Sequence, residues 1–517
     1  METIVMKKSI KLYTAVLALA SLVSCNLDYY PSNSIAFVPG QSLIQTEDDV
    51  KSYEVGIYAN FRALLGGEYD IADDLMFDGF NATRNYGNRY GGIHRTDSGF
   101  TPGDEYVENF WANNYTAIKN YNIIIESADN APGSIAAAVK YIAGEARLAR
   151  AVSYLRLARR FGDAYDAATA ESALCVPLVL KYDQQERPAR ATVKAVYDQI
   201  KADLDIAAEA LADDAGEAGA EYFTIDVVNA MYANYYLDTK EYTKAYTYAK
   251  ALIDSETYTL ASTVDDLTAE YTQDAGKEAI FKAHVALTEL PNSYGEYINY
   301  SKNSASPTGE QFSAGYIPSK TLIDSYEIQD IRFSAWFDKC TDIQYEYEGS
   351  YFQDKFYVFT KLKGNKALNA SGVISGRLAP RPFTIAEMHL IAAEAALNGG
   401  ASTTDGLAVL TALQTARKAS LSPALTADAV QKEWFRETVG EGRRLECLKR
   451  WKKGFEGRPA QEGAVQANVI MTLADINNDY EAKVMKADDY HFNWPIPAYE
   501  RKVNGNLVQN RGYSSVE

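Results

Sequence analysis

A helical hydrophobic period is the feature of this 517-residue chain that most restricts its fold. Within Tyr141 to Phe161, Leu148, Val152 and Leu155 recur at the i, i+4 and i+7 positions that line one face of a helix. Gly162 follows directly, where a helix C-cap prefers glycine. The segment therefore predicts one long amphipathic helix that ends at Phe161.

A second periodic stretch predicts a helical hairpin. Val227, Met231 and Tyr235 share one helical face, and a short break at 238–240 leads into a helix that carries Ala245 and Ala249. These small residues allow close approach of the two helices, as in a degenerate tetratricopeptide (TPR) unit. Further helices are expected at 107–128, 193–211, 385–397, 406–419 and 428–452.

Two regions interrupt the helical pattern. Between 271 and 380, prolines and glycines separate short polar and aromatic runs, and Phe356 to Phe359 has the composition of a strand. A second loop-rich stretch runs from Gly66 to Gly103. Long loops on a rigid helical frame are common places for binding residues. The expected fold is all-α, a scaffold of TPR-like hairpins with an inserted, loop-rich ligand-binding subdomain.

The first 25 residues have the pattern of an export signal. Three lysines at positions 7, 8 and 11 precede a short apolar run, Leu12 to Val23, that ends before Cys25. The run is shorter than the roughly 20 residues that span a bilayer, so a cleaved leader is expected. Small residues just before Cys25 resemble the lipobox of bacterial lipoproteins. We expect removal of residues 1–24, lipid on Cys25, and an extended lead over residues 25–46.

Charge and cysteine usage exclude several classes of function. The leader has a net charge of +2, so its removal changes the formal charge from −18 to −20, which argues against a nucleic-acid partner. Besides Cys25, three cysteines remain without metal-ligand spacing, and the four histidines are far apart. No motif of a hydrolase nucleophile, zinc protease or phosphate-binding loop occurs. We expect no metal, no cofactor and no enzymatic activity.

Several separated segments resemble the SusD/RagB family, in chain order over nearly the whole mature length. The N-terminal pair is Trp111 to Asn122, WANNYTAIKNYN, and Gly144 to Asp163, GEARLARAVSYLRLARRFGD. The later ones are Ser319 to Arg332, SKTLIDSYEIQDIR; Ile385 to Asn398, IAEMHLIAAEAALN; Arg436-Glu437 with Glu441 to Trp451, EGRRLECLKRW; and the closing Trp494-Pro495-Ile496-Pro497, Asn506-Leu507, Gln509-Asn510 and Gly512-Tyr513. These motifs fit helix contacts and caps better than a catalytic site. For Arg443 and Arg444 we expect buried pairs with Glu437 or Glu441.

The resemblance implies a non-catalytic, cell-surface nutrient-binding lipoprotein on the outer membrane of a Bacteroidota-type cell. Family members cover a SusC-like TonB-dependent transporter and pass an oligosaccharide or a peptide to it. The expected organisation is a leader (1–24), a lipid-anchored lead (25–46), a helical TPR-like region with its binding loop at 66–103 (47–270), a loop-rich insert (271–380) and a helical C-terminal region (381–517).

Candidate ligand-binding residues come from the two loop regions. The chain has 38 tyrosines against 19 phenylalanines, and tyrosine offers an apolar face with a hydrogen-bonding tip. The first loop region contributes acids, amides, an arginine and rings: Asp73, Asp74, Asn81, Arg84, Tyr86 and Tyr90. The insert contributes four aromatic residues: Tyr294, Trp336, Tyr345 and Tyr347.

Glycan is the ligand expected first, because sugars combine C–H faces that stack on rings with hydroxyls that bond to polar groups. A peptide, bound as by a RagB-like uptake protein, is the alternative. A helical glycoside hydrolase needs only two suitably spaced carboxylates, which no sequence motif reveals. A TPR-type scaffold for protein partners would instead bind on the helices rather than on the loops.

Overall fold

The computed structural model describes most of the chain. It covers residues 42–83, 86–96, 99–183, 185–298, 300–302, 310–347, 350–461 and 483–514. For residues 296, 300–302, 310–311, 340–347 and 350–353, only the backbone is described. The predicted leader and Cys25 lie outside these ranges.

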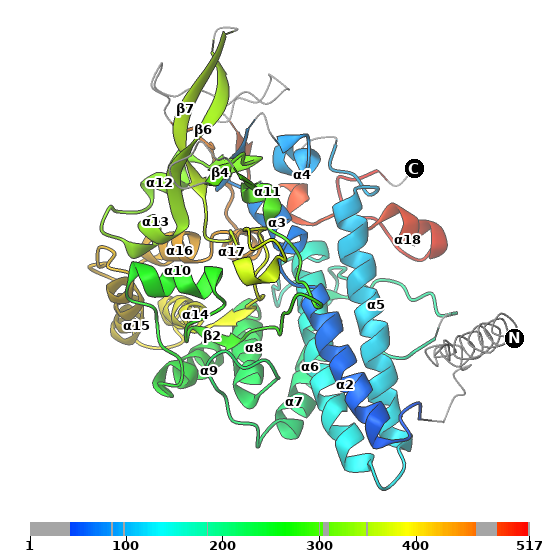
Figure 1. Cartoon of the computed structure of the whole chain (residues 1–517). Helices are drawn as coiled ribbons and strands as arrows, with labels where there is room; N and C mark the ends of the chain where they lie inside the picture. Colours follow the sequence, from blue (N-terminus) through cyan, green and yellow to red (C-terminus); the bar gives the residue numbers. More distant parts are fainter. Residues whose placement is uncertain are drawn as a thin grey trace, which may run out of the picture.

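Long helices form one half of the molecule (Figure 1). In chain order they are α2 (Glu47–Ala63), α5 (Glu105–Ser127), α6 (Ala136–Phe161) and α7 (Val193–Ala210). Helix α6 packs against α2, α5 and α7, and nineteen of its residues, from Val139 to Phe161, are buried. Thr46 starts α2 with a capping box, in which its hydroxyl accepts the Asp49 N–H at 3.1 Å and the Asp49 carboxylate accepts the Thr46 N–H at 3.0 Å.

Helical hairpins form the other half. Their helices are α8 (Ile225–Asp238), α9 (Tyr242–Asp254), α14 (Ile385–Leu397), α15 (Thr403–Ala416), α16 (Ala427–Glu437) and α17 (Arg444–Trp451). Helix α8 packs on α9, α9 on α14, and α14 on α15. Ala245 and Ala249 have no exposed surface, which confirms the predicted close approach of α9 to its neighbours.

The predicted single helix over 428–452 is wrong, because two glycines divide it. Helix α16 stops at Glu437, and α17 starts at Arg444. Between them Gly440 and Gly442 have φ values of +84° and +69°, which side chains with a Cβ rarely adopt. At Gly440 a Cβ would also lie 2.7 Å from the Phe359 ring, so the turn and the packing both require glycine.

The insert contains more ordered structure than its composition indicates. Strand β6 (Phe337–Tyr347) pairs antiparallel with β7 (Ser350–Phe359), and this hairpin projects from the body at the top of Figure 1. The strand predicted at Phe356 to Phe359 is confirmed as the end of β7. The short helices of the insert are α11 (Gly295–Ile298), α12 (Lys320–Asp324) and α13 (Ile331–Trp336), after α10 (Val264–Thr272).

Small two-stranded sheets join segments that are far apart in sequence. They are β1 (Phe80–Ala82) with β5 (Tyr316–Pro318), β2 (Ala279–Phe281) with β8 (Phe383–Thr384), β3 (Tyr300–Lys302) with β4 (Glu310–Phe312), and β9 (Phe455–Glu456) with β10 (Val484–Met485). The β1–β5 pair ties the first loop region to the insert.

Aromatic residues of the family motifs meet in the core. The Trp111 and Phe161 rings are 4.9 Å apart at 90°, and Trp494 lies 6.1 Å from Phe161. Cys175 and Cys447 are buried free thiols. Through the part of the chain that the structure describes, every helix is too short or too polar to cross a membrane.

Candidate ligand-binding face

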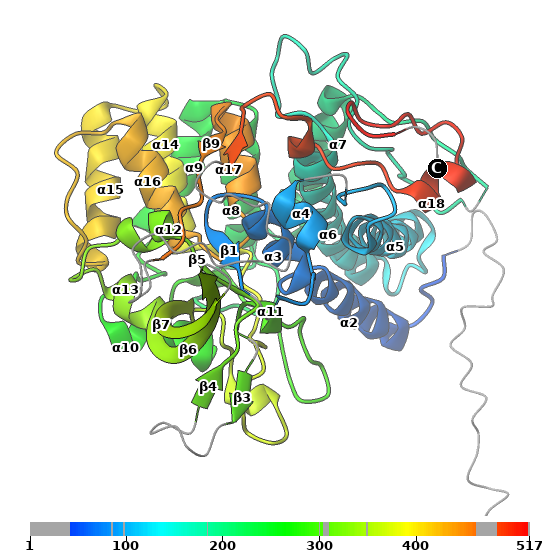
Figure 2. The ribbon, with the colours of Figure 1, turned by 90° about the horizontal axis from the view of Figure 1, so that it is seen from above.

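The two loop regions predicted to bind ligand share one face of the molecule. Asn81 on β1 pairs with Ile317 on β5, and β5 in turn contacts β7. Helix α4 (Gly91–Arg95), the β3–β4 pair and the β6–β7 hairpin surround this junction when the molecule is seen from above (Figure 2). Segments separated by more than 200 residues thus form one loop-rich surface, here called the loop face.

The loop around α4 holds strained backbone. Asn88, Tyr90 and Thr96 have φ values of +59°, +55° and +47°. Asparagine tolerates this left-handed region, whereas an aromatic and a β-branched residue adopt it at a cost of roughly 1–3 kcal/mol each. Arg95 stabilises the turn, because its guanidinium donates to Asn88 Oδ1 at 3.2 Å and to the Tyr86 hydroxyl at 3.4 Å. Strain held in this way is typical of binding and catalytic loops.

Tyrosine rings hold this loop against the scaffold. Tyr90 stacks on Tyr106 with centroids 4.1 Å apart, and Tyr86 packs edge-on against Tyr316 at 6.1 Å. The Tyr316 hydroxyl donates to the carbonyl of Arg89. Burial, reinforced by Tyr106, raises the pKa of Tyr90. Tyr86 and Tyr90 are only 5% and 6% exposed, so in this structure both rings are buried.

The three remaining described candidates of the first loop region are buried. Asp73 forms an ion pair with Arg160, and burial raises the pKa of Asp73 to about 7 although the guanidinium opposes the shift. Asp74 accepts a backbone N–H of the α16–α17 junction at 3.0 Å, and Asn81 donates to a backbone carbonyl next to β9 at 2.9 Å. The Asp73 ion pair holds helix α3 (Glu68–Leu75) against α6, and the bonds of Asp74 and Asn81 hold α3 and β1 against the C-terminal region.

Two of the aromatic candidates from the insert are buried as well. The Tyr294 hydroxyl donates to Asp70 Oδ2 at 3.1 Å. Trp336 has no exposed surface, and the ammonium of Lys361 lies 4.0 Å from its ring centroid. In this structure Trp336 packs inside the insert, whereas Tyr294 packs against α3 through Asp70. Ligand contact by them, as by the buried residues of the first loop region, stays a prediction.

The structure describes the three other candidates only in part or not at all. Arg84 lies outside the described residues, and Tyr345 and Tyr347 are described as backbone of β6. By register they share one face of the hairpin with Phe352, which is paired with Tyr345. Phe356 occupies the same face nearer the base and is 1% exposed. The hairpin face that is buried at Phe356 therefore carries aromatic residues, Tyr345, Tyr347 and Phe352, toward the tip of the hairpin.

A polar cavity of about 90 Å³ lies behind the loop face, where Tyr294 and Leu65 meet helix α6. Arg156, Arg159 and Arg160 line it from one side of α6. The Arg159 guanidinium binds Glu446 at 2.6 Å, so the charge is compensated. Such a volume accommodates a few ordered waters at about 30 Å³ each. These arginines belong to a segment that the sequence predicts as part of the scaffold, and their i, i+3, i+4 spacing on an apolar helix is the only local sign that they share one side of it.

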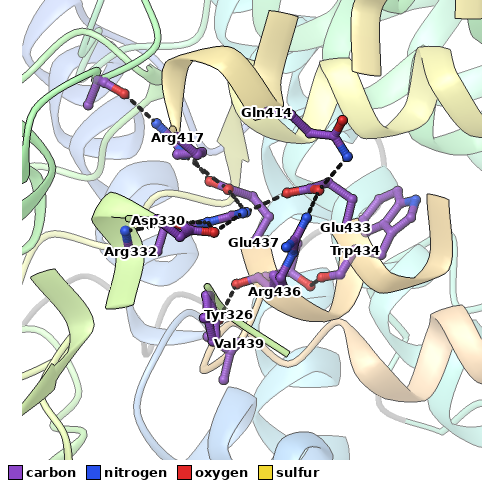
Figure 3. A network of polar contacts seen from close by, with 12 residues as sticks. Tyr326, Asp330, Arg332, Gln414, Arg417, Glu433, Trp434, Arg436, Glu437 and Val439 are labelled. Carbon is purple, nitrogen blue, oxygen red and sulfur yellow. Dashed lines mark hydrogen bonds and ion pairs between the residues drawn. The ribbon is translucent and has the colours of Figure 1, made fainter. Parts of the chain in front are cut away.

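A second polar network lies among the C-terminal helices (Figure 3). Arg332 binds Asp330, Glu433 and Glu437 at 2.7, 2.6 and 2.8 Å, and Arg417 binds Glu437 at 2.6 Å. Both arginines are fully buried. The acids and the arginines pair with one another in the interior, so this network is structural.

The expected pairing of Arg443 and Arg444 is right in kind and wrong in its partners. Arg443 binds Glu387 at 2.8 Å, and Arg444 binds Asp78 at 2.6 Å. Glu437 instead pairs with Arg332 and Arg417 in the network of Figure 3. Among the residues whose positions are described, no three His, Cys, Asp or Glu side chains are grouped to hold a metal ion.

Comparison with known proteins identifies the class. A family model described as starch-binding and associating with the outer membrane matches residues 80–237, and the SusD family model matches residues 277–513. The chain belongs to the SusD/RagB family. No curated protein matches the chain.

Solved structures share the helical fold over about nine tenths of this chain. A SusD superfamily protein of Bacteroides thetaiotaomicron superposes with a TM-score of 0.71 at 23% identity, covering 90% of this chain and 99% of its own. A putative sugar binding protein of Bacteroides vulgatus gives 0.71 at 20% identity, with 92% and 100% covered. A laminarin binding SusD-like protein gives 0.68 at 19% identity, with 91% and 100% covered. The predicted all-α, SusD-like fold is confirmed.

Proposed function

We propose that the protein is a non-catalytic glycan-binding lipoprotein that captures its ligand on the loop face and delivers it to a SusC-like TonB-dependent transporter. The observation that carries the proposal is the strained, tyrosine-braced loop around α4, which β1–β5 pairing places beside the insert. Membership in a family whose model is described as starch-binding and associated with the outer membrane supports the ligand class and the location. The similar solved structures described as sugar binding and laminarin binding also support a glycan as the ligand.

The β6–β7 hairpin supplies the aromatic part of the proposed site. Tyr345, Tyr347 and Phe352 occupy the face of the hairpin that is buried at its base. A ring that covers about 100 Å² of a sugar contributes about 2.5 kcal/mol before ordering costs, at roughly 25 cal/mol per Å². Two such rings with a few polar contacts suffice for micromolar binding, which corresponds to about 8 kcal/mol.

The anchor and the domain organisation complete the proposal. Lipid on Cys25 holds the protein at the outer face of the outer membrane, and the lead of residues 25–46 joins it to α2. Residues 47–270 and 381–517 form the helical frame around the loop-rich insert of residues 271–380. Ile44, near the end of the proposed lead, is fully buried, which supports a junction between lead and body at this position.

A binding screen with matched variants tests the proposal. Purified protein of residues 26–517 is titrated calorimetrically with neutral oligosaccharides and with a peptide pool. Tyr345→Ala combined with Tyr347→Ala is compared with Tyr222→Ala, since Tyr222 is 62% exposed and packs on Tyr58 of helix α2. We expect a glycan to bind and the double variant to weaken it at least about tenfold, which is 1.4 kcal/mol. Peptide binding, or equal affinities in all three proteins, would contradict the proposal.

A further inference from the structure

A second pocket lies away from the hairpin, where the C-terminal segment crosses the end of helix α6. Its volume is about 730 Å³, and its lining comes from the residues after α6, from α17 and from the chain near 488–493 and 509–511. Pockets that hold small ligands have volumes of about 300–1,000 Å³. Seen from above, α17 lies toward the top of the picture and the β6–β7 hairpin toward the bottom (Figure 2).

The floor of this pocket is rigid, because its polar groups already bind backbone carbonyls. Lys449 donates to the carbonyls of Arg159 and Gly162 at 2.7 and 2.6 Å. The Arg190 guanidinium donates to four carbonyls at 2.6–3.2 Å, including that of Leu174. These bonds close the C-terminal end of α6 and occupy two of the three N–H donors of Lys449 and four of the five of Arg190. Most new hydrogen bonds to a ligand therefore come from the rim.

The rim offers acceptors beside one guanidinium. The Asp163 carboxylate accepts from Asn493 through Oδ1, and Asp489 accepts from His491 through Oδ1. Burial alone would raise the pKa of Asp489, but the hydrogen bonds from His491 hold it below its usual range, so Asp489 is ionised. Within the described ranges, no donor is recorded at the second oxygen of either carboxylate or at the Asp488 side chain. Arg511 also faces the pocket.

The lining is balanced in charge and has an apolar wall. Four aspartates are matched by Arg190, Arg511 and two lysines. Leu174, which is 39% exposed, contributes an apolar surface. A balanced set of carboxylate acceptors and a guanidinium donor next to an apolar wall suits a neutral polyol better than a polyamine or a polyanion.

From this geometry we propose a second carbohydrate site, in which the pocket binds one or two units of a neutral sugar. Hydroxyl groups donate to the free oxygens of Asp163 and Asp489 and accept from Arg511, while a C–H face packs on Leu174. The site goes beyond the loop face and does not depend on it. Two sites on one chain would hold a branched or long glycan at two points, which raises the avidity.

Stoichiometry with blocked variants tests this site. The protein of residues 26–517 is saturated with maltose and, separately, with laminaribiose, and bound sugar is counted by equilibrium dialysis. Leu174→Trp fills the pocket from its rim, and Leu421→Trp is the control, since Leu421 is 55% exposed and does not line the pocket. We expect two bound sugars in the wild type and the control, and one in Leu174→Trp.

The Tyr345→Ala, Tyr347→Ala double variant separates the two sites. Binding that is lost in Leu174→Trp and retained in this double variant would support the pocket even if the proposed loop site failed. A single site that Leu174→Trp does not affect would overturn the pocket and leave the loop site standing. Pocket binding of spermidine instead of either disaccharide would overturn the assignment to neutral sugar.

Discussion

Replacing Arg417 by methionine tests how strongly the buried network of Figure 3 stabilises the fold. Arg417 has no exposed surface and binds Glu278 at 2.7 Å and Glu437 at 2.6 Å. Methionine keeps much of the length of the side chain and removes its charge. Glu437 retains Arg332 at 2.8 Å, whereas Glu278 loses the guanidinium that compensates its buried charge.

The expected cost follows from this loss of compensation. Removing one partner of a buried ion pair costs roughly 3–5 kcal/mol. At about 2.1 cal/mol/K per residue, a chain of this length has an unfolding entropy of about 1 kcal/mol/K, so Tm falls by about 3–5 °C. Differential scanning calorimetry at neutral pH measures the shift. Lys194→Met, which breaks an exposed pair with Asp198, is the control and should leave Tm unchanged.

Acidification should reduce the difference between wild type and Arg417→Met. Burial alone would raise the pKa of Glu437, but Arg417 and Arg332 outweigh it and lower the pKa to about 2. A lowered pKa contributes stability that is present above the unfolded value near 4.3 and is lost as the pH falls toward 2. The variant has less of this contribution to lose. A variant that melts like the wild type at pH 7 would refute the role of the network.

Three further perturbations address other parts of the account. Burial, with Glu54 and Asp214 adding to it, raises the pKa of Glu145 to about 8. The folded protein therefore loses stability as the pH rises from about 4.3 to 8, because Glu145 ionises more easily in the unfolded chain. Glu145→Gln should remove this loss, so its Tm should exceed that of the wild type at pH 9 and differ little from it at pH 4. Gly440→Ala should lower the free energy of unfolding in urea by at least about 1–2 kcal/mol, whereas Gly505→Ala, with open space around it, should not. Cys25→Ser should move the protein of fractionated cells out of the membrane fraction; retention there would contradict lipid anchoring.

The helical frame was largely predictable because its signals are local. Periodicity placed α6, α8 and α9 within a few residues, since an amphipathic helix repeats its burial every turn. The break between α16 and α17 was not predicted, because the pattern of apolar and charged residues continues across it. Glycine at positions 440 and 442 was the local sign of this break, and its meaning depends on backbone angles that only the packed structure reveals.

The loop face was predictable as a region and less so in its side chains. Loop composition drew attention to the residues around Tyr86, but helix α3 occupies part of that stretch, and burial of Asp73 depends on Arg160 from α6. Trp336 looked like a binding residue from its type, and the structure packs it on Lys361. A sequence shows which residues are able to bind a sugar, whereas long-range packing decides which of them meet solvent.

The most direct test of the central claim is the fate of a bound oligosaccharide. The protein of residues 26–517 is incubated with a binding oligosaccharide, the complex is isolated, and the sugar is released by denaturation and analysed by mass spectrometry. We expect the ligand to be recovered intact and at its starting length, with micromolar affinity in a parallel titration. Recovery of shortened products would contradict a capture protein and would indicate a glycoside hydrolase.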